Sequence, residues 1–470
     1  MQKKTKNSSA KSNNSSQPNI LYFHVDNLGQ GELGCYDGGL RRGAVTRRID
    51  QFASQGLKLW HYVTEAQCTP SRSALITGRH PIRSGTHTVS FGGEEGGLVA
   101  WERTIGDILS DAGYATCCMG KWHIGAEKGR FPTDHGFDEW YGIPRSYDEC
   151  LWPEDPRYDP KRDPVTYTLE GDKANGIHEN KDEQLTLELR RNIDREYEKR
   201  AFSFLRRSVR DSRPFFLYYN HSMMHLPNIP RDEFKGKSGY GDWADCLLEL
   251  DGDFGKMLDL LDELGVADNT IVVFAGDNGP EEMVLYRGAS GFYDGSYFTS
   301  SEGGLRTPCL IRWPGRIQAN RESNEMVHVT DMFTTLLSLA GCSIPADRVI
   351  DGKDQSAFFK GQSEVSAREG VIIWVGPHLH GVKWKDYKAL FIQTRYFFDP
   401  APPLGFLKLI DLISDPKERE PINHQYLPTW VMAHCGRLLK EFQESVNRES
   451  LIPAGAPLDF VPVRKVPKAA

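Results

Sequence analysis

The 470-residue sequence contains no apolar run long enough to cross a bilayer, so it predicts no transmembrane helix. Residues 1–17 are rich in Lys, Ser and Asn and have no apolar core. They therefore fail as a secretory signal and are expected to form a disordered tail. Positive charge is also not in excess, because the net charge is −7 and the pI is near 6.1. These features argue against a nucleic-acid partner and a membrane partner.

Paired cysteines are missing as well. The nine cysteines include no CxxC pair, and the sequence has no HExxH motif, so it predicts no zinc site of either type. An odd number of scattered cysteines is most simply explained by a reduced, cytoplasmic protein.

Apolar segments of strand length alternate with helical patterns in the first three quarters of the chain. The expected strands are Asn19–Val25, Lys58–Val63, Ala115–Met119, Phe215–Tyr219, Ile271–Ala275 and Cys309–Arg312. The expected helices are Arg47–Gln55, Thr104–Ser110, Lys181–Arg210, Asp242–Leu264 and Val329–Ala340. Near-continuous apolar strands are typical of a parallel sheet buried on both faces. We therefore expect an α/β fold with a large doubly wound, mostly parallel sheet over residues 18–345, in which residues 142–180 form a long insertion or lid.

The pattern changes after about residue 345. Val371–Val375, Ala389–Gln393 and Leu407–Leu412 are typical of strands, the Pro-rich segment 399–404 of a turn, and Thr429–Asn447 of a helix. Residues 346–455 are therefore expected to form a small antiparallel sheet with a helix, and residues 456–470 a tail.

One stretch, Cys68-Thr69-Pro70-Ser71-Arg72, is followed by a segment that suits a short helix from Ser71 to Thr77, ended by Gly78. Cys68 would lie just before the positive end of this helix, with Arg72 on the same face. A nucleophile beside a fixed cation is suited to attack an anionic ester.

Two expected strands end in the same polar pair. Asp26-Asn27 follows the first strand and Asp277-Asn278 follows a later one. Ligand sites of open α/β sheets collect at the carboxyl ends of strands, so the four side chains are expected to meet. Their oxygen donors favour Ca²⁺, or Mg²⁺, over zinc.

The stretch from Cys68 to Arg79 resembles the signature of the type I sulfatases, of the alkaline phosphatase superfamily. Resemblance extends over roughly residues 18–420, through Gly120-Lys121-Trp122-His123 and His225-Leu226-Pro227. It implies that a formylglycine-generating enzyme oxidises Cys68 to formylglycine, whose hydrated form attacks sulfur and later expels sulfate. It also implies that Lys121 holds a sulfate oxygen, that His123 steadies the diol, and that His225 protonates the leaving alkoxide.

The resemblance implies a metal site made of Asp26, Asn27, Cys68, Asp277 and Asn278. Asn27 stands where the family more often has aspartate, which removes one negative charge. A lysine that the family places before Glu302-Gly303-Gly304 is also missing, because residues 277–308 contain none. Arg287 or the hydroxyl of Tyr297 is a candidate to replace it.

The leading hypothesis is a metal-dependent arylsulfatase-like enzyme that hydrolyses aryl or similar small sulfate esters. One alternative is a phosphonate monoester or phosphodiester hydrolase with the same nucleophile. The other is a catalytically silent anion-binding homologue, which the change at Asn27 and the missing lysine would favour.

Overall fold

A ten-stranded sheet is the centre of the protein in a computed structural model that describes residues 17–90, 96–163, 165–283, 286–397, 399–422 and 427–465. The predicted tail of residues 1–17 lies outside these ranges except for Gln17. In spatial order, the strands are β13 (Arg321–Ser323), β2 (Leu57–Leu59), β12 (Cys309–Arg312), β9 (Thr270–Gly276), β1 (Asn19–Val25), β8 (Phe215–His221), β4 (Ala115–Gly120), β5 (Glu139–Gly142), β6 (Tyr167–Asp172) and β7 (Gly176–Gln184). This order confirms the predicted doubly wound α/β fold.

The five strands at the centre of the sheet run parallel. β1 lies between β8 and β9, and β4 joins β8 to β5, all in parallel register. Every residue of β1 is buried. Leu21 and Phe23 belong to the apolar cluster on one face of the sheet, whereas Ile20 and Tyr22 belong to the cluster on the other. Burial on both faces explains the continuous apolar sequence of these strands.

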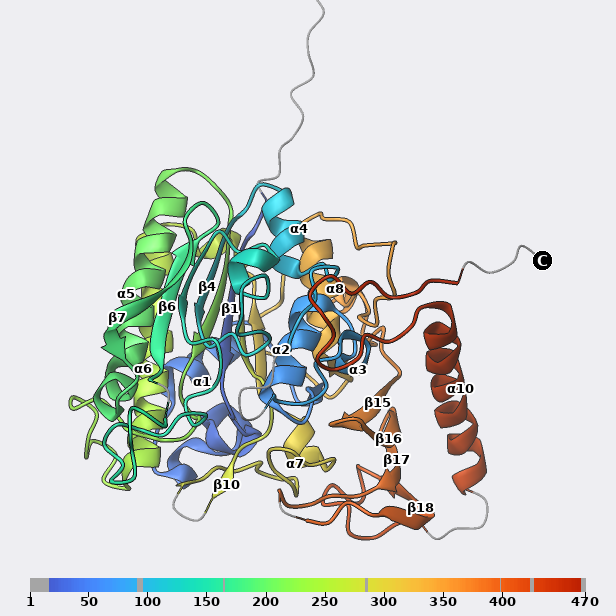
Figure 1. Ribbon diagram of the computed structural model, residues 1–470. Helices are drawn as coiled ribbons and strands as arrows, with labels where there is room; N and C mark the ends of the chain where they lie inside the picture. The colour runs from blue at the N-terminus through green and yellow to red at the C-terminus, as the bar shows by residue number, and fades with distance from the viewer. Residues whose placement is uncertain are drawn as a thin grey trace, which may run out of the picture.

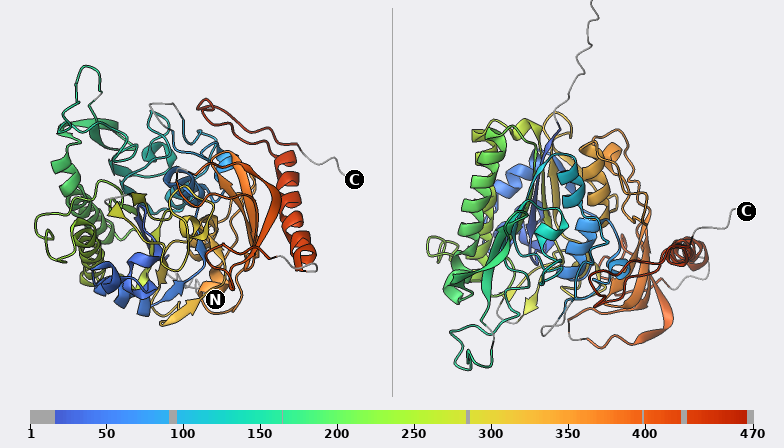
Figure 2. Two further views of the ribbon diagram at one scale, coloured as in Figure 1. Left: turned by 90° about the horizontal axis from the view of Figure 1, so that it is seen from below. Right: turned by 45° about the horizontal axis from the view of Figure 1, so that its top comes forward.

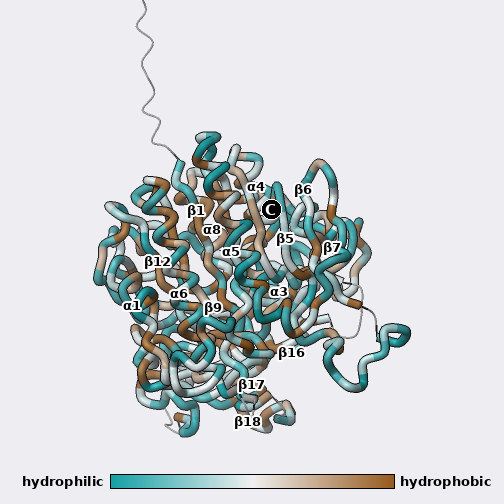
Figure 3. The backbone as a smooth tube through the Cα atoms, turned by 90° about the vertical axis from the view of Figure 1, so that its left-hand side faces the viewer, coloured by the Kyte–Doolittle hydropathy of each residue, from teal (hydrophilic) through white to brown (hydrophobic). Residues whose placement is uncertain are grey.

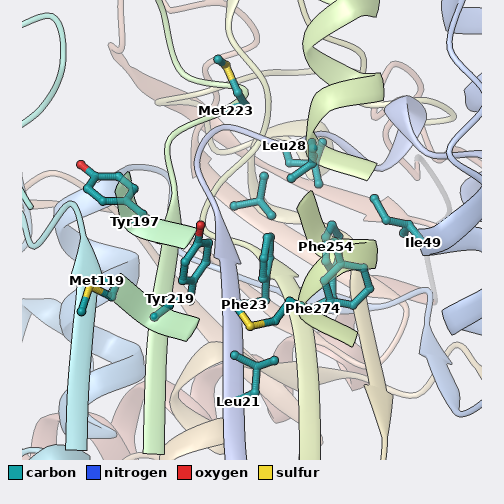
Figure 4. Packing of buried hydrophobic residues seen from close by; sticks show 14 of the residues in the cluster. Leu21, Phe23, Leu28, Ile49, Met119, Tyr197, Tyr219, Met223, Phe254 and Phe274 are labelled. Atoms are coloured by element: carbon teal, nitrogen blue, oxygen red, sulfur yellow. The ribbon is translucent and has the colours of Figure 1, made fainter. Parts of the chain in front are cut away.

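Two layers of helices cover the sheet (Figure 1). One layer contains α1 (Arg47–Ser54), α5 (Leu187–Arg210) and α6 (Asp242–Glu263), and the other contains α2 (Cys68–Thr77), α4 (Ile105–Asp111), α8 (Val329–Leu339) and α9 (Ser356–Phe359). Figure 4 shows Phe254 of α6 beside Phe23 and Phe274, with ring centroids 5.0 and 4.9 Å away. Hydrophobic residues recur along these interior elements, and the loops around them are mostly hydrophilic (Figure 3).

A separate four-stranded antiparallel sheet follows, as predicted. It consists of β15 (Gly370–Val375), β16 (His378–Trp384), β17 (Tyr387–Ile392) and β18 (Pro403–Asp411), and α10 (Leu427–Arg448) packs on it (Figure 2). Glu302 in α7 (Glu302–Leu305) joins this sheet to the large domain. Its carboxylate binds the buried ammonium groups of Lys383 and Lys388, 2.7 and 3.0 Å away.

Several predicted boundaries are wrong. Residues 181–184 end β7, and the helix begins only at Leu187, because Thr186 caps it. The segment 142–180 is not simply a lid, since its second half supplies β6 and most of β7 at the sheet edge. The predicted strand 58–63 is two short strands, β2 and β3 (Tyr62–Val63). Strand β16 was not predicted, and β18 begins within the Pro-rich segment predicted as a turn.

Small paired elements complete the fold. β3 pairs with β14 (Val327–His328), β10 (Glu282–Met283) pairs with β11 (Tyr286–Arg287), and α3 (Pro81–Ser84) follows α2. All nine cysteines are unpaired, as their spacing indicated. Among the described residues, no helix combines the length and the apolar character that crossing a bilayer requires.

Burial of His135 predicts a measurable pH dependence of stability. Burial lowers the pKa of this imidazole from 6.5 to about 4. As the pH falls from 6.5 to about 4, this histidine binds a proton in the unfolded chain but not in the folded one. The neutral ring therefore contributes about 2–3 kcal/mol of stability above pH 6.5 that is lost towards pH 4. Denaturant unfolding of wild type and H135N at several pH values should show their stability difference shrinking as the pH falls. A constant difference would contradict this account.

Candidate active site

Cys68 is the first residue of α2 and is buried. The helix begins three residues earlier than predicted, because Pro70 is tolerated in a first turn, where its missing N–H removes no hydrogen bond. Gly78 ends the helix in the left-handed conformation (φ 69°), as predicted. The Sγ atom of Cys68 lies 3.4 Å from Oδ1 of Asp26 and 3.7 Å from Oδ1 of Asn27. The thiol therefore faces the tip of β1.

The two Asp-Asn pairs lie side by side. β1 and β9 are neighbouring parallel strands with Val25 opposite Gly276, so their next residues emerge together. The backbone N–H of Asn27 donates to Oδ1 of Asp277 at 3.0 Å. The side-chain amide of Asn278 donates to Oδ1 of Asn27 at 2.6 Å. Asn27 has φ 54°, a left-handed conformation that asparagine tolerates better than most residues.

Arg72 joins the carboxyl ends of β1 and β9 to α2, the helix that begins at Cys68. Its guanidinium lies 2.9 Å from Oδ2 of Asp277 and 3.4 Å from Oδ2 of Asp26. It also donates to the side chain of Asn220, 2.8 Å away, at the carboxyl end of β8. Burial alone would lower the pKa of Arg72, but the two carboxylates outweigh burial and raise it. Arg72 is thus a fixed buried cation.

A chain of hydrogen bonds runs from Asp26 to His225. The ammonium of Lys121 lies 2.9 Å from Oδ2 of Asp26 and 3.0 Å from Oγ of Ser146. Ser146 in turn lies 2.9 Å from Nε2 of His225. The other ring nitrogen of His225 donates to the carbonyl of Leu226 at 2.7 Å, which directs Nε2 towards Ser146.

His123 is held as a neutral acceptor. Burial, and then the charge of Lys121, lower its pKa to about 4. Its Nε2 lies 2.7 Å from Oε1 of Glu149, so this nitrogen carries the proton. Nδ1 is buried and has no hydrogen-bond partner among the described residues. The free lone pair can therefore accept a hydrogen bond from a hydroxyl in the site.

The two carboxylates of the site are electrostatically coupled. Burial, followed by the charge of Asp26, raises the pKa of Asp277 to about 6. The pKa of Asp26 lies well below 3.8, because Lys121 and Arg72 outweigh its burial. Two carboxylates face two cations, so a bound divalent cation would give the site a net positive charge, which would favour binding of an anionic ester.

The donor set fits a hard divalent cation. Asp26, Asn27, Asp277 and Asn278 all present side-chain oxygens, and the buried Oδ1 of Asn278 has no partner among the described residues. Cys68 lies beside the same group.

A cavity of about 620 Å³ opens over these residues. Its lining includes Cys68, His123 and His225. It also includes four acidic residues and three aromatic ones, namely Asp148, Glu149, Glu281, Glu282, Tyr297, Tyr396 and Phe397. Both candidates for the missing lysine, Arg287 and Tyr297, line this cavity.

Sequence reasoning missed Ser146, Glu149, Asn220 and Arg190. Asn220 carried a usable signal, because it follows a buried strand as the Asp-Asn pairs do. Ser146 and Glu149 lie in the irregular segment after β5, where no motif marks them. Arg190 is a buried residue of α5 that donates to the carbonyl of His225 at 2.8 Å and so fixes that loop. His221 does not line the cavity and instead contacts Asp253 at 3.3 Å in the interior.

Comparison with known proteins identifies the family to which the chain is related. Residues 18–342 match the family described as Sulfatase, and residues 288–445 match the C-terminal region of N-sulphoglucosamine sulphohydrolase. The chain is 35% identical to N-acetylgalactosamine-6-sulfatase of Canis lupus familiaris, over 80% of this chain and 72% of that protein. It is 34% identical to human arylsulfatase A, over 85% of this chain and 82% of that protein.

Comparison with solved structures also indicates a sulfatase fold. PsFucS1 sulfatase from Pseudoalteromonas sp. superimposes with a TM-score of 0.86 at 30% identity, covering 92% of this chain and 91% of that one. With a family match over most of the chain and this shared fold, the protein belongs to the type I sulfatase family, whose members are sulfuric ester hydrolases.

Proposed function

We propose that Cys68, after oxidation to formylglycine by a formylglycine-generating enzyme, hydrolyses aryl or similarly compact sulfate esters. The observation that carries the proposal is the position of Cys68 between two buried carboxylates and two buried cations, at the base of the cavity. Such an arrangement is suited to the transfer of a tetrahedral anion.

An unmodified thiol is poorly suited to this reaction. Burial, and then the carboxylate of Asp26, raise the pKa of Cys68 well above 9.0. The thiol therefore stays protonated and donates towards Asp26, whereas a cysteine nucleophile needs the thiolate. Oxidation to an aldehyde, which hydrates to a geminal diol, removes this difficulty because the attacking atom becomes a hydroxyl oxygen.

The proposed reaction has two steps. A hydroxyl of the diol at residue 68 gives its proton to the carboxylate of Asp26, towards which the thiol of Cys68 donates. Its oxygen bonds to sulfur while the sulfur–alkoxide bond breaks, and His225, as the imidazolium, gives its Nε2 proton to the departing oxygen. The second diol hydroxyl then loses its proton as its oxygen forms the aldehyde, and the carbon–oxygen bond to sulfate breaks. His123 is placed to accept that proton, because its Nδ1 is free. Lys121 and Arg72 stabilise the charge that develops on the sulfate oxygens.

Asp26, Asn27, Asp277 and Asn278 would hold the metal, for which we propose Ca²⁺ because the donors are all oxygen. When bound, the metal polarises the sulfate oxygens and makes the diol hydroxyl more acidic.

The cavity supports a compact substrate without further negative charge. Tyr297 and Phe397 stack with ring centroids 5.7 Å apart and an interplanar angle of 19°, forming a flat apolar wall. The four acidic residues of the lining would repel a second anionic group on the substrate. An aryl ring or a neutral sugar ring fits both conditions. The named activities of arylsulfatase A and N-acetylgalactosamine-6-sulfatase support the same range.

Cys68→Ala should abolish turnover of an aryl sulfate, by at least about 10⁴-fold in kcat, because the nucleophile is lost. Turnover of an aryl sulfate, an aryl phosphodiester and an aryl phosphonate is measured in parallel, with Cys342→Ala as the matched control. Mass spectrometry of the peptide containing residue 68 should show CHO in place of CH₂SH. Faster phosphodiester or phosphonate turnover would favour that alternative, and no turnover of any substrate by the oxidised protein would favour a silent homologue.

Ser146→Ala should lower kcat/KM by about 10- to 100-fold, because the hydroxyl links the ammonium of Lys121 to Nε2 of His225. The loss should be smaller for substrates with good leaving groups, which need less protonation. Ser208→Ala removes another buried hydroxyl, which donates to the carbonyl of Phe204, and is the control. An equal loss for good and poor leaving groups would exclude a role through His225.

Tyr297→Phe should raise KM about 5- to 10-fold with little change in kcat, because we propose that its hydroxyl replaces the missing lysine in binding sulfate. This hydroxyl now accepts a hydrogen bond from the amide of Gln67, next to the nucleophile. Arg287→Gln tests the other candidate in the same steady-state assay. If only Arg287→Gln raises KM, then Arg287, and not Tyr297, replaces the missing lysine in binding sulfate.

A further inference from the structure

Three buried side chains outside the active site converge on one point. Nδ1 of His80 and Nε2 of His328 each lie 3.5 Å from Oε1 of Glu65. The three atoms all lie within 4.8 Å of one another. Each residue is at most 4% exposed. None of the three atoms has a hydrogen-bond partner in the part of the chain that the structure describes.

We propose that Glu65, His80 and His328 bind a structural zinc ion. Two imidazole nitrogens and one carboxylate oxygen are a donor set that favours zinc over calcium. Ligand atoms placed about 2.0–2.1 Å from a tetrahedral zinc lie about 3.4 Å from one another. The two distances of 3.5 Å to Glu65 match this spacing. Direct hydrogen bonds between the same groups would be about 2.7–2.9 Å long.

Hydrogen bonds already orient the ligands. The other ring nitrogen of His328, Nδ1, accepts the backbone N–H of Thr330 at 3.4 Å and lies 2.8 Å from Oγ1 of the same residue. When Nε2 binds metal, Nδ1 would give up the long bond from the N–H and donate to Oγ1 instead. The backbone N–H of His80 donates to Asp351 at 2.8 Å. Ser71 contacts both backbone groups of Glu65, at 3.0 and 3.1 Å. The backbone at His80 and Glu65 and the ring of His328 are therefore held in place by contacts outside the three ligand atoms.

Neighbouring charges are already paired and leave Glu65 to the metal. Arg83 binds Asp351, and Arg368 binds Asp331 through two of its nitrogens. Access is also available, because His80 lines a second cavity of about 330 Å³ that shares no residue with the active-site cavity. A zinc ion would enter, and a water would complete its coordination, from that side.

The position of the site gives it a function. Glu65 precedes α2 by three residues, His80 follows it by three, and His328 caps the start of α8. A shared metal would join the segment entering the nucleophile helix to the segment leaving it, and both to the neighbouring helix. We therefore assign the zinc a structural role in holding α2, and with it residue 68, against the sheet.

Zinc content of the full-length protein tests the site. Wild type and the buried-histidine control H135N, kept in calcium and equilibrated with Zn²⁺, should each retain about one zinc per chain after dialysis. His328→Asn keeps a good helix cap but removes the ligand nitrogen, so it should weaken zinc affinity about 100-fold or more while calcium content stays the same. Wild type without zinc, or equal zinc in wild type and His328→Asn, would overturn the proposal.

Anomalous diffraction removes any dependence on the folding of the variant. Data from wild-type crystals grown with Zn²⁺ and recorded at the zinc edge should show a peak among Glu65, His80 and His328. Crystals without a peak there would overturn the assignment. Both readouts are independent of catalytic activity, so failure of the proposed reaction would leave them unchanged.

Discussion

The site depends on the electrostatic balance between Arg72, Lys121, Asp26 and Asp277 in a region closed to water. None of these side chains is more than about 1% exposed, so each charge is stable only because an opposite charge contacts it. Removing any one of the four side chains would leave one buried charge of the opposite sign without compensation. The same balance supports the proposed oxidation of residue 68, because a thiolate there would meet the charges of two carboxylates. It also explains why a cation and an anionic ester would be bound together.

The fold produces this balance through strand register. Strands β9, β1, β8 and β4 are parallel neighbours. Their carboxyl ends supply Asp277, Asp26, Asn220 and Lys121, although Asp26 and Asp277 are 251 residues apart in the sequence. Helix α2 contacts all four of these residues through one side chain, Arg72. The connection between β17 and β18 of the small sheet contributes Tyr396 and Phe397 to the cavity wall, and the contacts of Glu302 with two lysines hold that sheet. The large sheet thus positions the charged residues of the site, and the small domain contributes part of the cavity wall.

The sequence predicted those parts of the structure that a local motif or a periodic apolar pattern marks. The buried strands could be predicted because their apolar runs are continuous, and the two Asp-Asn pairs because they follow such strands. The edge strands β6 and β7 could not, since exposed and polar residues such as Glu179 and Asp182 resemble a helix as much as a strand. Ser146 and Glu149 could not be found either, because only tertiary contacts bring them to Lys121 and His123. The cluster of Glu65, His80 and His328 has no motif spacing at all.

A high-resolution crystal structure of the mature protein from its native host, with bound sulfate, tests the central claim most directly. We expect residue 68 to carry oxygen rather than sulfur and to contact both the sulfate and a cation held by Asp26, Asn27, Asp277 and Asn278. Sulfate should also contact Lys121 and Arg72. An unmodified Cys68 with no cation between the two strand tips, and sulfate bound elsewhere, would contradict the account.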